Sequence, residues 1–176
     1  MIKVLGFDYG ASSGRAMLGI YDNGKVTLEE VHRFSNDPVN INGTMYWDVL
    51  RLFHELKTGI IECRKKGHGD ISSIAIDTWG VDFGLLDKDG RLLENPVHYR
   101  DQRTDGMIDA ACEVVPRKEI YKRTGIQFMQ FNTLYQLYAL QQKRPDILER
   151  ANKMLFMPDL LNYFLTGNMY SEYSIA

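Results

Sequence analysis

The chain has 176 residues, a length that suits one domain or two small ones. Hydrophobic residues make up 44% and charged residues 25%, an ordinary globular balance that excludes an intrinsically disordered chain. The net charge of −2 gives no basic surplus that would indicate binding to nucleic acid or to an anionic membrane. Two cysteines are too few for a disulfide framework, and no apolar run is long enough for a signal peptide or a membrane span. We therefore expect a cytoplasmic protein with free thiols.

The beginning of the chain predicts three consecutive antiparallel strands. Residues 2–8 form an apolar run, and residues 15–21 and 25–34 alternate between apolar and polar side chains. Asp22-Asn23-Gly24 favours a tight hairpin, because Asn and Gly accept the positive φ angles of such a turn. Residues 36–44 carry Asn, Pro and Gly and are expected to form a loop.

The rest of the chain predicts helices that alternate with short strands. Apolar residues recur at helical spacing over residues 47–66, and residues 71–77 are expected to form a buried strand. Further expected elements are a hairpin at 81–93, helices at 104–115, from Pro116, at 132–143 and from Pro158 to Gly167, and a strand at 154–157. The helix at 132–143 is expected to bury Leu134, Leu137, Tyr138 and Leu140. This order predicts an α/β fold with a mixed sheet flanked by helices.

A small polar turn at residues 10–14, followed by Arg15, lies between the first two expected strands. Glycines let a backbone approach a phosphate closely, and Ser12, Ser13 and the turn amides can donate hydrogen bonds to phosphate oxygens. Arg15 adds a planar fork of charged donors. Asp8 ends the first strand, where a carboxylate can hold Mg²⁺ through water beside the phosphates. An ordinary glycine-serine hairpin with an exposed arginine remains an alternative.

A second motif, Asp77-Thr78-Trp79-Gly80-Val81-Asp82, follows the expected buried strand, where ligands often collect in α/β sheets. Trp79 offers an apolar face to the C–H side of a sugar ring, and Gly80 lets a ligand meet the backbone. Asp77 and Asp82 can accept hydrogen bonds from hydroxyl groups. The alternative is a plain turn between a strand and a hairpin, with a tryptophan in the core.

Two more motifs have a structural and a functional interpretation. The segment Tyr99-Arg100-Asp101-Gln102-Arg103-Thr104 either caps a helix with Asp101 or Thr104 or contributes Asp101 and Arg103 to a site. The segment at 127–134 mixes amides with aromatic side chains, as a sugar pocket does, and includes Phe131 and Asn132. Asn132 is also a candidate for a plain helix N-cap.

Together, in this order and at these separations, the motifs resemble the FGGY family of carbohydrate kinases over nearly the whole chain. The matching segments are 10–15, 76–83, 99–104, 125–128, 131–137, 157–159, 165–167 and 172–173. The resemblance implies an actin-like, ribonuclease-H-like fold of two domains. Residues 1–176 would be the N-terminal domain, with the phosphate loop and most sugar contacts, and a C-terminal domain would hold most of the nucleotide site.

The resemblance also implies a reaction and the residues that serve it. The γ-phosphoryl group of ATP, with Mg²⁺, would move to a sugar hydroxyl, and the motif at 77–82 favours L-rhamnulose and its 1-hydroxyl over fuculose, xylulose, ribulose or glycerol. The expected phosphate-binding residues are Ala11, Ser12, Ser13, Gly14 and Arg15. Asp8 would lie near Mg²⁺, and Gly80 would contact the sugar. Further candidates for the sugar pocket are Trp79, Asp82, Asp101, Arg103, Phe131 and Asn132.

One element of the family pattern is missing. The family's catalytic base is an aspartate of a Gly-x-x-Asp-type motif early in the second half of the protein, a region that we expect to lie beyond these 176 residues. We therefore expect no catalytic residue in this chain, no turnover by it alone, and a missing C-terminal domain as its partner. The residues at 172–176 do not resemble a natural end, so we expect a piece of a larger protein. A non-catalytic, actin-like nucleotide-binding module is the alternative, and the oligomeric state stays open.

Overall fold

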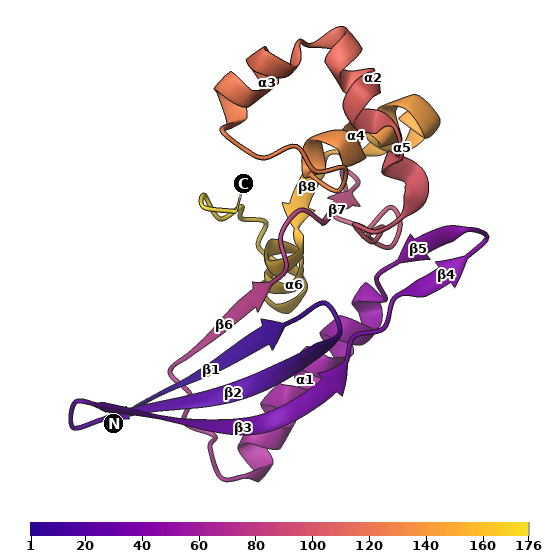
Figure 1. Ribbon diagram of the computed structural model, residues 1–176. Helices are drawn as coiled ribbons and strands as arrows, with labels where there is room; N and C mark the ends of the chain where they lie inside the picture. The colour runs from indigo at the N-terminus through magenta and orange to yellow at the C-terminus, as the bar shows by residue number, and fades with distance from the viewer. Residues whose placement is uncertain (176) are drawn as a thin grey trace. The chain divides into compact units, whose positions relative to one another are not determined.

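A computed structural model describes residues 1–175 (Figure 1). Ala176, the last residue of the segment expected to be an unnatural end, lies outside the described residues. The chain divides into two compact units. Unit 1 contains residues 1–39, 47–80 and 155–176, and unit 2 contains residues 40–46 and 81–154.

Unit 1 is built on a four-stranded mixed sheet. Its strands are β1 (Ile2–Tyr9), β2 (Ser13–Asp22), β3 (Lys25–Ser35) and β6 (Ser73–Thr78), in the order β3-β2-β1-β6. The first three strands pair antiparallel, and β6 pairs with β1 in parallel. Asn23 and Gly24 turn from β2 to β3 with φ angles of 47° and 78°. The predicted three-stranded meander is confirmed.

The core of unit 1 lies between this sheet and α1 (Val49–Lys65), which runs along one face of the sheet in Figure 1. Asp48 caps α1 by accepting a hydrogen bond from the backbone N–H of Arg51. The helix lies so close to the sheet that position 59 has no room for a side chain. A Cβ atom at Gly59 would lie 2.6 Å from the ring of Phe7. Other core side chains here that are at most 2% exposed include Leu5, Leu18, Leu52 and Leu56. Helix α6 (Met157–Thr166) packs on β6.

The expectation of a buried strand at residues 71–77 is wrong in its burial. The strand forms as β6, but Ile74 is 37% exposed, and Ser73, Ala75 and Asp77 are exposed as well. The reason is topological, because β6 lies at the edge of the sheet and has β1 as its only neighbour there among the described strands. An apolar run marks a strand without telling how many neighbours it has.

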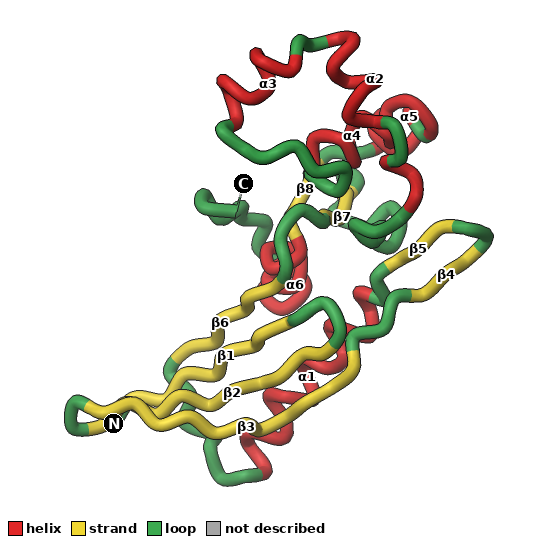
Figure 2. Tube along the Cα trace, in the orientation of Figure 1, coloured by secondary structure: helices red, strands yellow, loops and turns green. Residues whose placement is uncertain are grey.

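The expected loop at 36–44 instead contains a short hairpin, so that prediction is wrong. Strands β4 (Val39–Ile41) and β5 (Thr44–Tyr46) pair with each other, as Figure 2 shows. Asn42 and Gly43 form the turn, with φ angles of 52° and 84°. The same Asn-Gly dipeptide that joins β2 to β3 is used again here, between strands of three residues each.

Unit 2 is mainly helical. Its elements are β7 (Phe83–Leu86), the 3₁₀ helix η1 (Gln102–Thr104), α2 (Met107–Val114), α3 (Arg117–Thr124), α4 (Thr133–Lys143) and α5 (Pro145–Arg150). β7 pairs with β8 (Lys153–Phe156) and Leu86 bridges to Leu92. The helix expected at 104–115 is divided by Gly106, whose φ is 75°, and α5 was not predicted. No helix of residues 1–175 has the length and apolar character that crossing a membrane requires.

Helix α4 buries a face that overlaps only in part with the one expected. Leu140 is buried as expected, but Leu134 is 45% exposed, and Tyr135, Gln136 and Ala139 are buried with Leu140. The sequence pattern assigned the interior to the apolar residues alone. The structure turns the helix so that an amide side chain lies inside, where it makes the hydrogen bonds described below.

Candidate functional site

Residues 10–15, which the sequence predicts to bind phosphate and which we call the phosphate turn, connect β1 to β2 and include the first residues of β2 in unit 1. Ala11, Ser12 and Arg15 are exposed, whereas Gly14 is buried. The backbone N–H of Gly10 donates to the carbonyl of Ser13 at 2.9 Å and closes the turn. Glycine is required at position 14 for packing, because a Cβ atom there would overlap the ring of Phe34. The turn therefore presents short polar groups and an arginine to solvent from a rigid base.

Asn36 holds the phosphate turn from behind, a role that the sequence analysis missed. Its side-chain amide donates to the carbonyl of Gly10 at 2.8 Å, and its backbone N–H donates to the carbonyl of Ser12 at 3.0 Å. Asn36 itself is only 3% exposed. These two bonds occupy carbonyl groups, so the turn is fixed through its acceptors. The Asn-Asp-Pro run after β3 gave only a loop signal.

The carboxylate of Asp8 lies at the end of β1 between two charged neighbours on adjacent strands. Arg15 of β2 is its cross-strand partner, with Nε 3.2 Å from Oδ2, and Asp77 of β6 is its partner in the parallel pair. Side-chain exposures of 56% for Asp8 and 44% for Arg15 leave both groups open to a ligand. Among residues 1–175 no group of three or more His, Cys, Asp or Glu side chains is placed to hold a metal. Carboxylate oxygens suit Mg²⁺, so a metal here would need water or phosphate oxygens to complete its ligands.

The residues just after β6 combine an aromatic stack with an open glycine. The ring of Trp79 lies 3.9 Å from that of Trp47, centroid to centroid, and Trp47 is fully buried. Gly80 is exposed, and a Cβ atom built on it would meet nothing within 4 Å. Packing within the described part of the protein therefore does not require a glycine at this position.

Val81 follows directly with a φ of 67°, a left-handed conformation that a β-branched residue rarely adopts. Two side chains of α4 hold its carbonyl, which accepts from Thr133 Oγ1 at 2.9 Å and from Gln136 Nε2 at 3.3 Å. Strain of this kind persists only where the surroundings impose it, and such places cluster at functional sites. The observation favours a functional interpretation of the motif at 77–82.

Asp82 and Arg103 are joined in unit 2 through Gln136, which the sequence analysis did not select. The amide nitrogen of Gln136 donates to Asp82 Oδ1 at 2.9 Å and to the carbonyl of Phe131 at 2.8 Å, and its oxygen accepts from Arg103 Nη2 at 2.6 Å. The second oxygen of Asp82 accepts from the backbone N–H of Tyr99 at 3.2 Å. Asp82 and Gln136 are each 1% exposed, so this is an interior network.

Asp101 organises the start of η1. One of its carboxylate oxygens accepts from the N–H of Arg103 at 2.9 Å and the other from the N–H of Met45 at 2.8 Å. The expected helix cap is thus present, and Asp101 also binds the β5 strand. Burial lowers the pKa of Arg103, and the nearby carboxylates of Asp101 and Asp82 oppose that shift. Within the described part of the chain the buried Nε of Arg103 has no hydrogen-bond acceptor.

The remaining predicted sugar residues lie at the start of α4. Asn132 occupies the N-cap position, but its side chain donates to the carbonyl of Gln127 at 2.8 Å and makes no capping bond. Phe131 packs its ring edge-on against Tyr99, with the centroids 5.8 Å apart. The structure thus places Asp82, Asp101, Arg103, Phe131 and Asn132 in unit 2, and the phosphate turn, Trp79 and Gly80 in unit 1.

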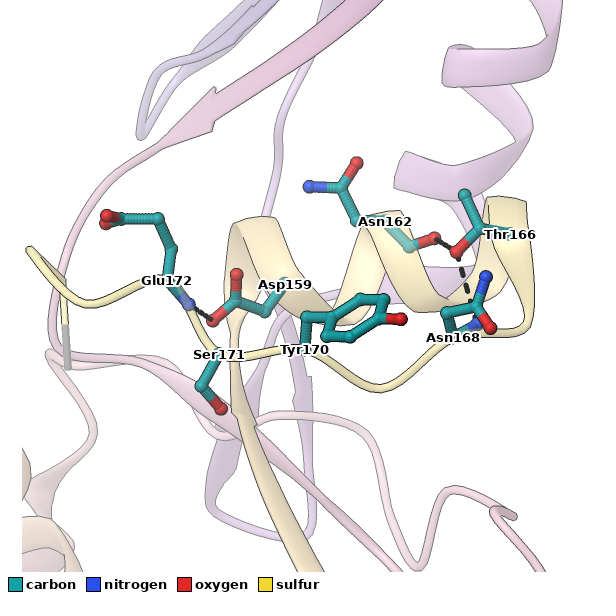
Figure 3. A pocket seen from close by; sticks show the side chains of 7 residues that line it. All are labelled: Asp159, Asn162, Thr166, Asn168, Tyr170, Ser171 and Glu172. Atoms are coloured by element: carbon teal, nitrogen blue, oxygen red, sulfur yellow. Dashed lines mark hydrogen bonds between the residues drawn. The ribbon is translucent and has the colours of Figure 1, made fainter.

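A cavity of about 410 Å³ in unit 1 contains none of the predicted site residues. It lies between α6 and the chain that follows it, and Figure 3 shows the carboxylate of Asp159 accepting from the backbone N–H of Glu172 at 3.2 Å. Its lining residues are Asp159, Asn162, Thr166, Asn168, Tyr170, Ser171 and Glu172. These residues provide carboxylates, hydroxyl groups and side-chain amides, but no cationic side chain that could pair with a phosphate. A smaller cavity of about 200 Å³ in unit 2 is lined in part by Asp101 and Arg103.

Comparison with known proteins identifies similar sequences along the whole chain. The N-terminal domain of the FGGY family of carbohydrate kinases matches residues 3–176. The chain is 46% identical over 172 residues to a rhamnulokinase of Oceanobacillus iheyensis and 47% identical over 172 residues to one of Halalkalibacterium halodurans. Each match covers 98% of this chain and 36% of the relative, so the chain spans about a third of the length of these curated relatives.

Solved structures of carbohydrate kinases have the same fold. A ligand-bound xylulose kinase from Lactobacillus acidophilus superposes with a TM-score of 0.82 at 22% identity and covers 96% of this chain and 34% of its own. Glycerol kinase from Plasmodium falciparum with ADP gives 0.75 at 19% identity, with 96% and 35% covered. At these identities the likeness concerns the fold alone, and it confirms the expected actin-like α/β architecture.

Proposed function

Because the chain belongs to the FGGY family of carbohydrate kinases as an N-terminal domain, we propose that it forms the phosphate-loop and sugar side of an ATP-dependent L-rhamnulose kinase. The observation that carries this proposal is the identity of 46–47% to rhamnulokinases, sustained over 98% of the chain. It is joined by the exposed phosphate turn and by the strained, open segment Gly80-Val81. Residues 1–176 make up one N-terminal domain in this proposal, and a C-terminal domain completes the enzyme.

In the proposed reaction the 1-hydroxyl oxygen of L-rhamnulose attacks the γ-phosphorus of ATP. A new P–O bond to the sugar forms as the bond to the β-phosphate oxygen breaks, which gives L-rhamnulose 1-phosphate and ADP. A general base must accept the hydroxyl proton, and we assign that role to a carboxylate outside this chain. The chain itself contributes binding and electrostatic stabilisation, which supply most of the catalysis in phosphoryl transfer.

The phosphate turn suits the ATP phosphates by its exposure and its chemistry. Residues 11–14 would offer backbone and hydroxyl donors, and the guanidinium of Arg15 would pair with phosphate oxygens. Asp8 would hold Mg²⁺ through water, close to the parallel-paired carboxylate of Asp77. Bound Mg²⁺ supplies charge neutralisation of the phosphates. Because Asn36 and the Phe34 ring already fix the turn, little ordering would accompany binding.

Of the residues that we propose for the sugar site, some would touch the sugar and others would shape the pocket around it. Gly80 and Trp79 would touch the sugar through an open backbone and an aromatic face. Phe131 and Asn132 would contribute an aromatic edge and an amide, while Asp82, Asp101 and Arg103 already bind protein groups and would shape the pocket. The two free cysteines, Cys63 and Cys112, agree with a reducing compartment, so we place the enzyme in the cytoplasm.

The test is phosphoryl transfer from Mg·ATP by the intact parent protein to L-rhamnulose, with fuculose, xylulose, ribulose and glycerol in parallel. We expect a clear preference for L-rhamnulose in kcat/KM, and no turnover by residues 1–176 alone. Preference for another sugar would leave the family assignment intact and overturn L-rhamnulose as the proposed substrate. Turnover of L-rhamnulose by residues 1–176 at the rate of the intact protein would overturn the assignment of the base to another domain.

A further inference from the structure

A single buried amide, that of Gln136, connects the separate segments that we assign to the sugar site within unit 2. Its nitrogen donates to Asp82 Oδ1 at 2.9 Å and to the carbonyls of Phe131 and Val81 at 2.8 and 3.3 Å. Its oxygen accepts from Arg103 Nη2 at 2.6 Å. We call these groups the amide network. We propose that Gln136 is a positioning residue that sets the geometry of the sugar site, an inference that rests on the proposed function.

The chemistry of the network requires an amide at this position. A neutral side chain lies between a carboxylate and a guanidinium, with its donor end toward Asp82 and its acceptor end toward Arg103. Glutamate would keep the acceptor and lose the donor, lysine would keep a donor and lose the acceptor, and methionine would lose both. Asparagine is one methylene shorter. Because Gln136 is 1% exposed, no solvent replaces a missing bond, so a lost donor or acceptor stays unsatisfied.

The network also acts on the strained backbone next to Gly80. Val81 keeps its left-handed φ of 67° while its carbonyl is bound by Gln136 and by Thr133 of the same helix. Gly80 immediately precedes Val81 in the chain. Gln136 therefore acts on the sugar through Val81, Asp82 and Arg103, and not by touching it.

This arrangement makes a kinetic prediction that a merely structural role does not make. The partners of Gln136 include three residues of the predicted sugar set and none of the phosphate turn. Loss of the network should therefore raise the KM for the sugar and leave the KM for ATP nearly unchanged. General damage to the fold would instead lower activity toward both substrates together with the melting temperature.

The experiment compares Gln136→Glu, Gln136→Met and a polarity swap, Gln136→Glu with Asp82→Asn, in the intact kinase. The swap places a donor on residue 82 and an acceptor on residue 136, so that the bond between them forms in the opposite direction. Asp82→Asn alone is measured beside it. Gln141→Glu is the matched control, since it adds the same charge to an exposed position of α4. The melting temperature and the KM values for L-rhamnulose and ATP are measured for each variant.

We expect Gln136→Glu to raise the sugar KM about tenfold or more, the effect of losing a hydrogen bond to a charged group. The KM for ATP should stay within about twofold of the wild-type value. The polarity swap should lower the sugar KM at least about threefold relative to Gln136→Glu alone. If Gln136→Glu does not fold, Gln136→Met and the swap carry the same comparison. The control should match the wild type.

Two results would overturn the role of Gln136 while leaving the enzyme assignment intact. One is a sugar KM within about twofold of the wild type in both Gln136→Glu and Gln136→Met. The other is a parallel rise of both KM values that follows the melting temperature, without recovery in the swap. A wild-type protein that phosphorylates none of the ketoses overturns the proposed function itself, and this outcome is visible before any variant is compared.

Discussion

The phosphate turn and the amide network are both polar, but they use their hydrogen-bonding groups in opposite ways. In the turn, Ser12 and Arg15 are exposed to solvent, and Asn36 binds the carbonyls of Gly10 and Ser12. In the network, Asp82 and Gln136 are 1% exposed, and their donors and acceptors bind other protein groups. The turn leaves polar groups exposed to solvent, whereas the network uses its polar groups to hold the interior of the protein in place.

The difference follows from the ligands that we propose. A triphosphate with Mg²⁺ brings strong charges, so exposed donors on a rigid turn suffice to bind it. A neutral sugar gives weaker individual contacts, so its recognition depends more on how accurately the surrounding backbone is placed. Substitutions of exposed groups in the turn should therefore change ligand binding alone, whereas substitutions in and around the network should also change stability.

The largest effect should come from Gly14, the buried residue of the phosphate turn. Because it is buried, its substitution should change stability and not ligand binding alone. In Gly14→Ala the new methyl group overlaps the ring of Phe34, which packs against Tyr9 with the centroids 5.3 Å apart. We expect the free energy of unfolding to fall by about 3 kcal/mol or more, measured by urea denaturation. Gly6→Ala in β1 is the control, because its nearest neighbour would be 3.8 Å away. Equal stabilities of the two variants would contradict this packing argument.

We expect acid to lower the stability of the protein through the buried side chain of His98 in unit 2. Burial and the positive charge of Arg100 lower the pKa of His98 from 6.5 to about 4. Between these values the unfolded chain binds a proton that the folded chain excludes, so stability falls as the pH drops from about 6.5 to about 4, by up to roughly 3 kcal/mol. Denaturation at a series of pH values measures this loss.

The matched variants for this pH effect are His98→Asn and His54→Asn. Asn at position 98 can still accept from the backbone N–H of Arg100, which now donates to Nδ1 at 2.9 Å, but it cannot titrate. His54 is exposed on α1, so His54→Asn serves as the matched control for replacing a histidine by asparagine. If His98→Asn loses stability with acid as steeply as the wild type over this interval, another group is responsible.

Arg15→Ala should separate binding from stability in the turn. The ion pair with Asp8 is about half exposed, so its loss should change the free energy of unfolding by less than about 0.5 kcal/mol. The KM for ATP should nevertheless rise about tenfold, because a charged donor to the phosphates is removed. Arg123→Ala removes an arginine from another exposed ion pair, with Glu119, and should alter neither quantity. An unchanged ATP KM in Arg15→Ala would exclude this arginine from the phosphate site.

The smallest effect should be that of Gly80→Ala. The added methyl group meets nothing within 4 Å in the protein, so stability should change by less than about 1 kcal/mol. The sugar KM should rise about fivefold, because the methyl group occupies space that we assign to the ligand. Gly69→Ala, also without a neighbour within 4 Å, is the control and should leave the kinetics unchanged. A normal sugar KM in Gly80→Ala would place the sugar elsewhere.

What the sequence could predict depended on the range of the interactions involved. The meander of β1 to β3 followed from alternation and from Asn23-Gly24, and the ends of α6 followed from Pro158 and Gly167. The β4–β5 hairpin was missed because its strands are short and Val39–Ile41 is exposed throughout. These successes and failures are local, and turn chemistry with residue periodicity accounts for them.

The interior polar residues could not have been found in this way. Gln136 lies 54 positions from Asp82 and 33 from Arg103, and nothing in the pattern of α4 shows that these side chains meet. Asn36 resembles any loop asparagine until its bond to Gly10, 26 positions away, is seen. The motifs include most residues of both regions, but the hydrogen bonds of Gln136 and Asn36 become apparent only from the tertiary structure.

The parallel pairing of β6 with β1 has a consequence for the order of folding. Each pair in the meander is joined by a short turn, whereas Val4 pairs with Ser73 across nearly seventy residues. Closing that longer loop costs more chain entropy, so we expect the meander to form early and β6 to join it later. The phosphate turn would then be in place before Trp79 and Gly80, which follow β6, acquire their positions.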